Sequence, residues 1–378
     1  MKRTIEIAAK VIAKADPEHP ADAVLRAELK NAKGITRNDG GVISEMVFAY
    51  YRWLGWLNQK SSIAEQLEEA VERNRDFQNN PDLISAPELQ RAIPGWVKEQ
   101  LEVSPEWLRA LQLEPNIWLR ARPGKGRGLA ERLGECWVRG EGLLADALRY
   151  DGAEDLFRTA EFHAGEFELQ DLSSQAVGWM CHPQPGETWW DACAGEGGKA
   201  LHLSDLMRNQ GLLWASDRVA WRLQKFKRRA ARAKVFNYRA VLWDGGAKLP
   251  TKTKFDGILV DAPCSGLGTW QRNPQARWTT TLRDVNELGA VQQALLANVV
   301  AALKPGGRLI YSVCTLTKAE TTQVAEAISG IFADLKPLSF QNPLKPDEPA
   351  TNSLWLWPQT SQGNGMFICG WTKIQEQA

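Results

Sequence analysis

From Leu172 onward, short apolar runs alternate with amphipathic segments. Runs such as "TWWDACA", "GLLWASD" and "FDGILVDAP" have the length and composition of buried strands, and helically spaced segments separate them. Parallel strands need long crossover connections, which are usually helices. The alternation therefore predicts an α/β fold with a mostly parallel sheet covered by helices on both faces. Ligands bind such sheets outside the carboxyl ends of the strands.

The first 170 residues have a different pattern. Residues 1–80 contain four segments with apolar residues at helical spacing, and Ser61 or Ser62 is a plausible cap for the fourth. Residues 81–170 mix helical segments with "NIWLRARPGKGRGLAERLGE", which indicates a strand, a basic turn and a helix. We therefore expect a small helical bundle over 1–80, a small α+β linking region over 81–170 and the α/β domain over 171–378.

The composition is that of a globular protein, with 44% hydrophobic and 24% charged residues. The sequence contains no run of about 18 apolar residues, and its start lacks the continuous apolar stretch of a signal peptide. We expect a cytoplasmic, monomeric protein that does not associate with membranes and whose six cysteines are mostly reduced. Because no CxxC pair is present and the chain has only four histidines, we expect no metal site.

Small or acidic residues follow four strands of the predicted sheet. The loop "DACAGEGGKA", Asp191 to Ala200, offers small residues for close approach to a ligand and a helix start with free amides. It does not match the phosphate-loop motif, and a tight structural turn remains an alternative. The next strands end in Asp217, Asp244 and Asp261, and an acidic residue at the first of these positions suits ribose hydroxyls. Turn preference explains each aspartate singly but explains the series poorly.

Two cysteines also end predicted strands on the ligand side. Cys264 follows the strand in "LVDAPCSGLGTWQRNP", and Cys314 ends "RLIYSVCTL". A deprotonated thiol is a strong nucleophile, whereas a buried cysteine more often acts as a small apolar residue. We assign the apolar role to Cys136, Cys181 and Cys369, and treat Cys264 and Cys314 as candidates for chemistry.

These motifs resemble those of the RNA cytosine-carbon-5 methyltransferases of the RsmB/Nop/Sun family. The similarity lies in the order and spacing of "LQDLSSQAVGWM", "PGETWWDACAGEGGKA", "DAPCSGLGTWQRNP", "YSVCTLTKAE" and the closing "NGMFICGW". The resemblance implies a Rossmann-like class I methyltransferase domain with a mixed, mostly parallel sheet. The helical amino-terminal part is similar to the NusB-like RNA-binding domain of bacterial members.

The resemblance also implies roles for individual residues. Cys314 would attack carbon 6 of cytosine, so that carbon 5 becomes electron-rich enough to accept a methyl group from S-adenosyl-L-methionine. Asp261 would hydrogen-bond the cytosine ring, and Cys264 would assist release of the covalent intermediate. The residues implied to surround the cofactor are Cys193, Ala194, Gly195, Glu196, Gly197, Gly198, Lys199, Asp217 at the ribose, Asp244 on the adenine side, and Asp261.

The sequence departs from the family's pattern in three places. Gly195 and Glu196 stand where Ala-Pro is usual, and Glu196 brings a negative charge near the cofactor. Val313 stands where threonine is usual and cannot donate a hydrogen bond. Residues 320–322 read Glu-Thr-Thr in place of the common Glu-Asn-Glu. Because both thiols are kept, we expect an active but divergent member.

Two basic segments are candidates for RNA contact. Residues 218–239 carry many Lys and Arg, no acidic residue, and four interleaved aromatics: Trp221, Phe226, Phe236 and Tyr238. Such a segment can bind phosphates and stack on bases, but an amphipathic helix with a solvated basic face and core aromatics explains it equally well. The loop "RARPGKGRG" and the loop after Cys264 supply the other candidates: Arg120, Lys125, Arg127 and Arg272.

The leading hypothesis is an S-adenosylmethionine-dependent RNA 5-methylcytosine methyltransferase that acts on small-subunit (16S) rRNA. One alternative is the same reaction on tRNA. Another is a catalytically inactive RNA-binding assembly factor that keeps the fold. Enzymes that methylate amines are disfavoured, because direct attack by an amino group needs no cysteine at Cys314.

Overall fold

A computed structural model describes residues 2–374 of the chain. Contacts divide the chain into two compact units. Unit 1 extends as far as Pro115 and also includes Gly266–Val285, whereas unit 2 comprises Asn116–Ser265 and the chain from Asn286 onward. The three-part division at residues 80 and 170 stays a prediction, because grouping by contacts does not test which parts fold independently. Within residues 2–374, no helix is long and apolar enough to cross a membrane.

Unit 1 is helical, which confirms the helical amino-terminal region. Its helices before Pro115 are α1 (Lys2–Lys14), α2 (Ala21–Asn31), α3 (Arg37–Trp53), α4 (Ile63–Asn79), α5 (Ala86–Leu89), α6 (Val97–Gln100) and α7 (Pro105–Gln112). Capping boxes begin two of them: Thr36 with Asp39 before α3, and Ser62 with Glu65 before α4. Ser62, rather than Ser61, is therefore the cap of the fourth helix. The likeness to a NusB-like domain stays a prediction.

The segment Gly266–Val285 joins unit 1 through buried polar contacts. It contains the short helix α13 (Ala276–Thr279) and the start of α14 (Leu282–Val300). The fully buried Arg277 donates to the Gln112 side chain at 2.6 Å, and the Trp278 indole N–H donates to the Tyr51 carbonyl at 2.7 Å. These bonds fix α13 against α3 and α7.

The main sheet of unit 2 has a parallel centre and an antiparallel edge. Its strands are β5 (Thr188–Asp191), β6 (Leu212–Asp217), β7 (Tyr238–Leu242), β8 (Phe255–Asp261), β9 (Leu303–Val313), β10 (Leu335–Pro337), β11 (Ser353–Leu356) and β12 (Met366–Lys373). Their order is β10-β12-β9-β8-β5-β6-β7, and β11 pairs with β12. Strands β9, β8, β5, β6 and β7 run parallel, whereas β12 is antiparallel to β9. The predicted mixed, mostly parallel sheet is confirmed.

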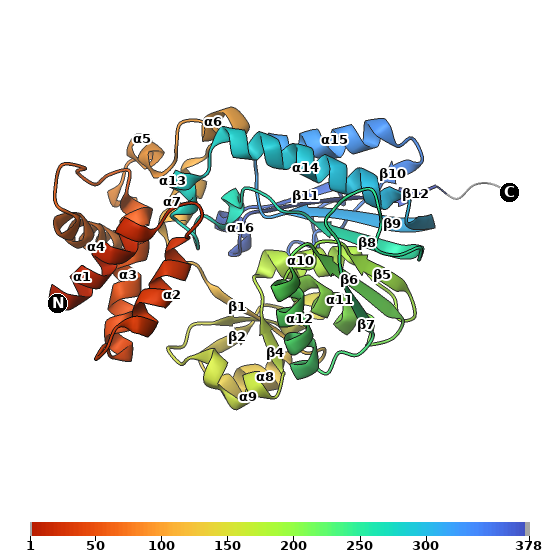
Figure 1. The fold of residues 1–378 in the computed structure, drawn as a ribbon, viewed down its shortest axis with the longest axis horizontal. Coiled ribbons are helices and arrows are strands. Elements are labelled where there is room, and N and C mark those ends of the chain that lie inside the picture. The colour runs from red at the N-terminus through yellow and green to blue at the C-terminus, as the bar shows by residue number, and fades with distance from the viewer. Residues whose placement is uncertain (1, 375–378) are drawn as a thin grey trace. The chain divides into compact units, whose positions relative to one another are not determined.

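Helices cover both faces of this sheet, as Figure 1 shows. Helices α10 (Leu172–Cys181), α11 (Gly198–Leu206) and α12 (Ala220–Arg232) lie on one face, and α14 with α15 (Thr322–Ile331) on the other. Neighbouring strand residues point to opposite faces. Trp189 therefore packs into the core beside α10 and α11, whereas Trp190 packs into the core beside α14. Both tryptophans are fully buried, as expected for core residues.

A second, antiparallel sheet precedes the main sheet in unit 2. Its order is β2 (Cys136–Val138), β3 (Ala147–Tyr150), β1 (Ile117–Ala121) and β4 (Phe167–Leu169), with helices α8 (Gly126–Leu133) and α9 (Ala160–His163). The strand, turn and helix predicted from "NIWLRARPGKGRGLAERLGE" correspond to β1 and α8. The small sheet thus belongs to the same compact unit as the main sheet.

Candidate active site

The two candidate thiols meet at the carboxyl ends of adjacent parallel strands. Cys264 follows β8 and Cys314 follows β9, and β8 pairs with β9. Their Sγ atoms are 3.3 Å apart, and neither cysteine is in a disulfide. The topology therefore gathers, from positions 50 residues apart, the two thiols singled out in the sequence.

A charged pair lies beside the thiols. Lys199 Nζ, from the start of α11, is 2.7 Å from Asp261 Oδ2 at the end of β8. The Ser312 hydroxyl donates to Asp261 Oδ1 at 2.8 Å. Burial alone would lower the pKa of Lys199, but Asp261 raises it, so the ammonium keeps its charge.

The surroundings of Cys314 favour its thiolate. The hydrogen bond from Cys264 lowers the pKa of the Cys314 thiol below its ordinary value and outweighs both burial and the negative charge of Asp261, which raise it. The positive charge of Lys199 also lowers it. At the remaining cysteines with a shifted pKa, burial raises it: Cys136 (to about 11), Cys181, Cys193 and Cys369. This contrast separates Cys314 from the four cysteines outside the thiol pair.

The alkylation rate of Cys314 should therefore depend on pH with a midpoint below 9.0, the ordinary value for a thiol. Only the thiolate reacts, so the rate rises as the pH rises through the pKa. Removing the hydrogen-bond donor with Cys264→Ala should move the midpoint to higher pH. Iodoacetamide labelling followed by mass spectrometry of the Cys314 peptide measures this shift. A Cys136→Ala variant is the control, and an unchanged midpoint in Cys264→Ala would refute the hydrogen-bond effect.

A buried carboxylate links the loops that follow the two cysteines. Glu320 is fully buried and accepts hydrogen bonds from the Ser265 backbone N–H at 2.8 Å, the Ser265 hydroxyl at 2.5 Å and the Thr317 hydroxyl at 2.8 Å. Ser265 directly follows Cys264, and Thr317 lies three residues after Cys314. Sequence reasoning noted Glu320 only within a departure from the family's pattern and missed this contact.

Replacing Glu320 with glutamine should reduce methyl transfer by about 10²-fold, because small displacements of reacting groups have effects of this size. An amide cannot accept from all of these donors at once. Incorporation of a labelled methyl group into RNA measures the effect, and thermal melting tests whether the variant folds. Glu326→Gln, at an exposed position on α15, is the matched control. Equal activity in a folded Glu320→Gln variant would show that the carboxylate does not position the thiols.

A cavity of about 480 Å³ adjoins this cluster at the carboxyl ends of β5, β6 and β8. Eight of the residues implied to surround the cofactor line it: Cys193, Ala194, Gly195, Glu196, Gly198, Asp217, Asp244 and Asp261. Two others do not. Gly197 packs so closely that a Cβ atom would lie 2.0 Å from the Phe226 ring, and Lys199 pairs with Asp261. The sequence did not identify the remaining lining residues, among them Arg218, Arg222 and Trp243.

The donors of this cavity fit S-adenosylmethionine. Asp217 is 7% exposed, and its carboxylate is held by the backbone N–H groups of Gly195, at 3.1 Å, and Val219, at 2.8 Å. Carboxylates suit ribose hydroxyls and the cofactor's sulfonium and ammonium groups. Arg218 and Arg222 in the same lining suit its carboxylate.

Two departures from the family's pattern have a local explanation. Glu196 Oε1 is paired with Lys225 Nζ at 2.7 Å, so its charge is compensated. Val313 is fully buried and packs into the core on the α14 face, whereas Cys314 packs against the opposite core. A side chain at position 313 therefore stabilises the sheet.

One candidate RNA contact is wrong. Arg120 is only 3% exposed, its guanidinium is paired with Asp205, and it donates to the Gln170 side chain at 2.7 Å. A guanidinium that is buried and paired in this way has no surface to offer a phosphate. Lys125 and Arg127 are exposed and stay predictions. Arg272 lies in the segment of unit 1 that follows η5 (Leu267–Thr269), and its role also stays a prediction.

The basic segment 218–239 divides between the two interpretations. Phe226 is fully buried, and its ring packs edge-on against Tyr238, so these two aromatics belong to the core. Trp221 and Phe236 are 54% and 75% exposed. Core packing thus explains one pair of aromatics and leaves the other pair on the surface.

The sheet order and the cavity at its carboxyl edge define an α/β methyltransferase fold. A family model described as 16S rRNA methyltransferase RsmB/F matches residues 179–372. The chain belongs to the RsmB/F methyltransferase family.

Two individual relatives agree with this assignment, and a solved structure shares the fold. A probable ribosomal RNA small subunit methyltransferase B of Synechocystis sp. is 33% identical over 305 residues, which are 75% of this chain and 67% of the relative. The mouse tRNA (cytosine(72)-C(5))-methyltransferase NSUN6 is 38% identical over 174 residues, 42% of this chain and 36% of that protein. The crystal structure of a protein called PH0851 has a TM-score of 0.77 at 19% identity and covers 98% of this chain and 97% of its own.

The chain spans less of other relatives. It covers 49% of a probable ribosomal RNA small subunit methyltransferase B of Bacillus subtilis and 48% of a ribosomal RNA small subunit methyltransferase F of Aeromonas salmonicida.

Proposed function

We propose that the chain is an S-adenosylmethionine-dependent RNA cytosine-C5 methyltransferase whose substrate is 16S rRNA. The observation that carries the proposal is the contact between the Sγ atoms of Cys264 and Cys314, 3.3 Å apart, beside the Lys199–Asp261 pair. Transfer to an amine would need no thiol nucleophile. The names of the family model and of the Synechocystis relative favour small-subunit rRNA over tRNA.

In the proposed mechanism, the Cys314 thiolate adds to carbon 6 of cytosine, and the ring electrons become available at carbon 5. Asp261 accepts a hydrogen bond from the amino group of the cytosine and so orients the ring, and the Lys199 ammonium beside it stabilises the negative charge that develops on the ring. S-adenosylmethionine, when bound, supplies the electrophilic methyl group. Cys264 then assists removal of the proton from carbon 5, and the bond between Cys314 and carbon 6 breaks to restore the aromatic ring.

In the proposed complex, the cavity at the ends of β5, β6 and β8 holds the cofactor. Asp217 binds the ribose hydroxyls, and Asp244 lies on the adenine side. Asp261 lines this cavity and also contacts Lys199 and Ser312 in the thiol cluster. The same residue therefore borders the proposed cofactor site and the proposed base site.

The test is a methylation assay on defined RNA. The protein would be incubated with S-adenosylmethionine and either small-subunit rRNA, assembled small subunits or total tRNA, and the nucleosides analysed by mass spectrometry. We expect 5-methylcytosine in the rRNA arms. Product only in the tRNA arm would move the substrate to tRNA. RNA binding without 5-methylcytosine in any arm would contradict the enzyme and favour an inactive assembly factor.

A further inference from the structure

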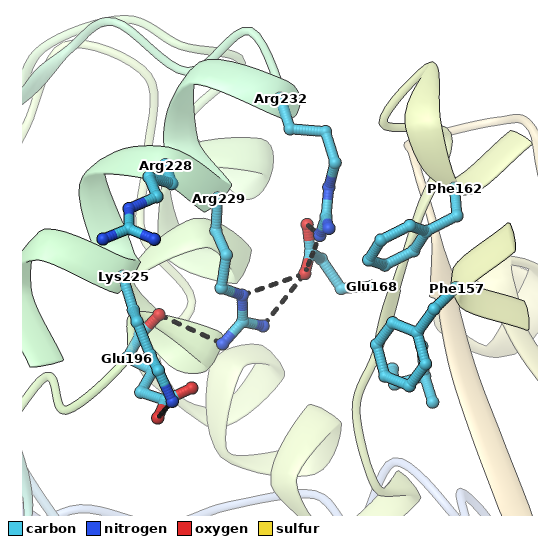
Figure 2. A pocket seen from close by; sticks show the side chains of 9 residues that line it. Phe157, Phe162, Glu168, Glu196, Lys225, Arg228, Arg229 and Arg232 are labelled. Carbon is cyan, nitrogen blue, oxygen red and sulfur yellow. Dashed lines mark hydrogen bonds and ion pairs between the residues drawn. The ribbon is translucent and has the colours of Figure 1, made fainter. Parts of the chain in front are cut away.

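A second cavity of unit 2 lies between α12 and the small sheet. It encloses about 360 Å³ and is bordered by α12, by β4, and by the turn and short helix at residues 156–163. Figure 2 shows Phe157 and Phe162 on one side and Lys225, Arg228 and Arg229 on the other. Glu196 and Arg229 line both this cavity and the proposed cofactor site. The two cavities are therefore neighbours.

The charge of the second cavity favours an anion. Four cationic side chains line it, against two carboxylates, Glu168 and Glu196. Glu168 is 2% exposed and is already paired with Arg229 and Arg232, and Glu196 is paired with Lys225. Within the described part of the chain, the exposed Arg228 has no hydrogen-bond or ion-pair partner. Its guanidinium is available to a phosphate.

The opposite wall offers an aromatic surface. Phe157 is 57% exposed, and its ring is held edge-on against Phe162 at a centroid distance of 5.0 Å. Phe162 is in turn covered by the Arg232 guanidinium, 3.8 Å above its ring. An aromatic ring exposed to water does not stabilise the core, whereas a ring fixed at a cavity wall can stack on an unpaired base.

The face of α12 that lines this cavity carries an exposed aromatic residue as well as basic ones. Trp221, Lys225 and Arg228 are spaced by four and three residues, so they lie on one face of the helix. Trp221 is 54% exposed, and Lys225 Nζ lies 4.7 Å from the centre of its ring. Aromatic rings next to cationic groups are typical of surfaces that bind single-stranded nucleic acid.

We propose that this cavity binds an unpaired nucleotide of the RNA substrate, outside the base that is methylated. The base stacks on Phe157, and the adjoining phosphate binds Arg228. This inference rests on the proposed function, because it assigns part of the RNA to a surface beside the same site. Its consequence is that Phe157 and Arg228, which line this cavity and not the proposed cofactor site, affect RNA affinity but not cofactor affinity.

The test compares matched variants of the full chain. Binding of a fluorescent single-stranded RNA that contains the methylated sequence would be measured by anisotropy over a range of salt concentrations. Phe157→Ala should weaken binding about 5- to 150-fold, the loss measured for one stacked base. Arg228→Gln should reduce the slope of log K against log salt by about 0.7, the value for one phosphate contact on a single strand.

The controls are equivalent residues outside the cavity. Lys227→Gln removes a charge from an exposed position on α12 that lines neither cavity, and Phe236→Ala removes a ring that is 75% exposed elsewhere. In turnover assays, Phe157→Ala and Arg228→Gln should raise KM for RNA and leave kcat and the Kd of S-adenosylmethionine unchanged. Thermal melting confirms that the variants are folded.

The outcomes separate this inference from the proposed function. If the wild type binds and methylates RNA but the two cavity variants behave as their controls do, the cavity does not bind RNA and the proposed function stands. If the wild type produces no 5-methylcytosine while the cavity variants still lose affinity, the surface binds RNA and the proposed reaction is wrong. Weakening of all four variants by equal factors would also overturn the inference, since it would indicate a diffuse charge effect.

Discussion

A Cys264→Ala variant is expected to accumulate a protein–RNA adduct that survives denaturation, and a Cys314→Ala variant is expected to form none. The reason is the order of bonds in the proposed reaction. Cys314 forms the covalent bond to cytosine, whereas Cys264 acts in the step that breaks it. Removing the second thiol therefore stalls the enzyme after the bond has formed. Denaturing gels with S-adenosylmethionine and substrate RNA measure this directly.

Turnover should fall in both variants, but a different step of the reaction is blocked in each. Loss of a nucleophile typically costs at least about 10⁴-fold in rate, so Cys314→Ala should show no methyl transfer above background. Cys136→Ala is the matched control, because this cysteine lies in the small sheet and burial raises its pKa to about 11. An adduct in Cys314→Ala, or the absence of one in Cys264→Ala when RNA still binds, would reverse or reject the proposed roles.

Much of the main sheet could be predicted because its signals are local. The runs around Trp189, Leu213 and Ile258 are apolar on both faces of the sheet. Their alternate residues pack into the cores on its two faces. Parallel strands bring their carboxyl ends to one edge, so residues that follow the strands converge there. This is why Cys264 and Cys314, chosen from the sequence alone, lie in contact.

Other features depend on partners far away in the sequence. Arg120 looks like part of a basic loop in the sequence, but its guanidinium is paired with the carboxylate of Asp205, 85 residues later. No local pattern in the segment Gly266–Val285 predicts that it joins unit 1, because Arg277 contacts Gln112 only in the folded chain. The position of Glu320 between the two cysteine loops is equally non-local. Local patterns indicate which elements form, but not which buried charges meet.

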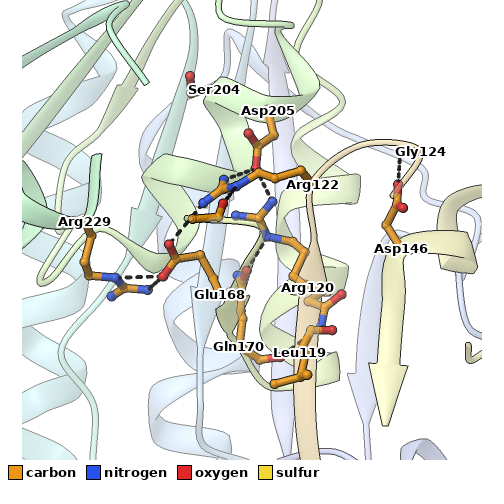
Figure 3. A network of polar contacts seen from close by, with 12 residues as sticks. Leu119, Arg120, Arg122, Gly124, Asp146, Glu168, Gln170, Ser204, Asp205 and Arg229 are labelled. Carbon is orange, nitrogen blue, oxygen red and sulfur yellow. Dashed lines mark hydrogen bonds and ion pairs between the residues drawn. The ribbon is translucent and has the colours of Figure 1, made fainter. Parts of the chain in front are cut away.

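Replacing Glu168 with glutamine is expected to lower the free energy of unfolding strongly. Figure 3 shows its carboxylate at the centre of a polar network that joins the small sheet to α11 and α12. It accepts hydrogen bonds from Arg122 at 3.1 Å, Arg229 at 2.9 Å and Arg232 at 2.7 Å. Glu168→Gln leaves three guanidinium groups around a neutral amide, and removing one partner of a buried ion pair costs about 3–5 kcal/mol. We expect a loss of this order in the free energy of unfolding at pH 7.

The effect should depend on pH with a defined sign. Burial alone would raise the pKa of Glu168, but Arg229, Arg232 and Arg122 lower it below 4.5, its ordinary value. A carboxyl whose pKa is lower in the folded state stabilises the protein above its unfolded pKa, and that stability is lost as the pH falls through the folded pKa. The difference between wild type and Glu168→Gln, measured by urea denaturation, should therefore shrink below about pH 4.5.

Glu166→Gln provides the control two residues away. Glu166 pairs with Arg132, and their side chains are 36% and 47% exposed, so its loss should cost at most about 1 kcal/mol. Equal losses in the two variants would refute the buried network. The network also reaches the proposed cofactor site, because Arg229 donates to the backbone carbonyl of Glu196 at 3.0 Å. A folded Glu168→Gln variant should therefore bind S-adenosylmethionine more weakly, since the arginine that holds this loop has lost the carboxylate that fixes it.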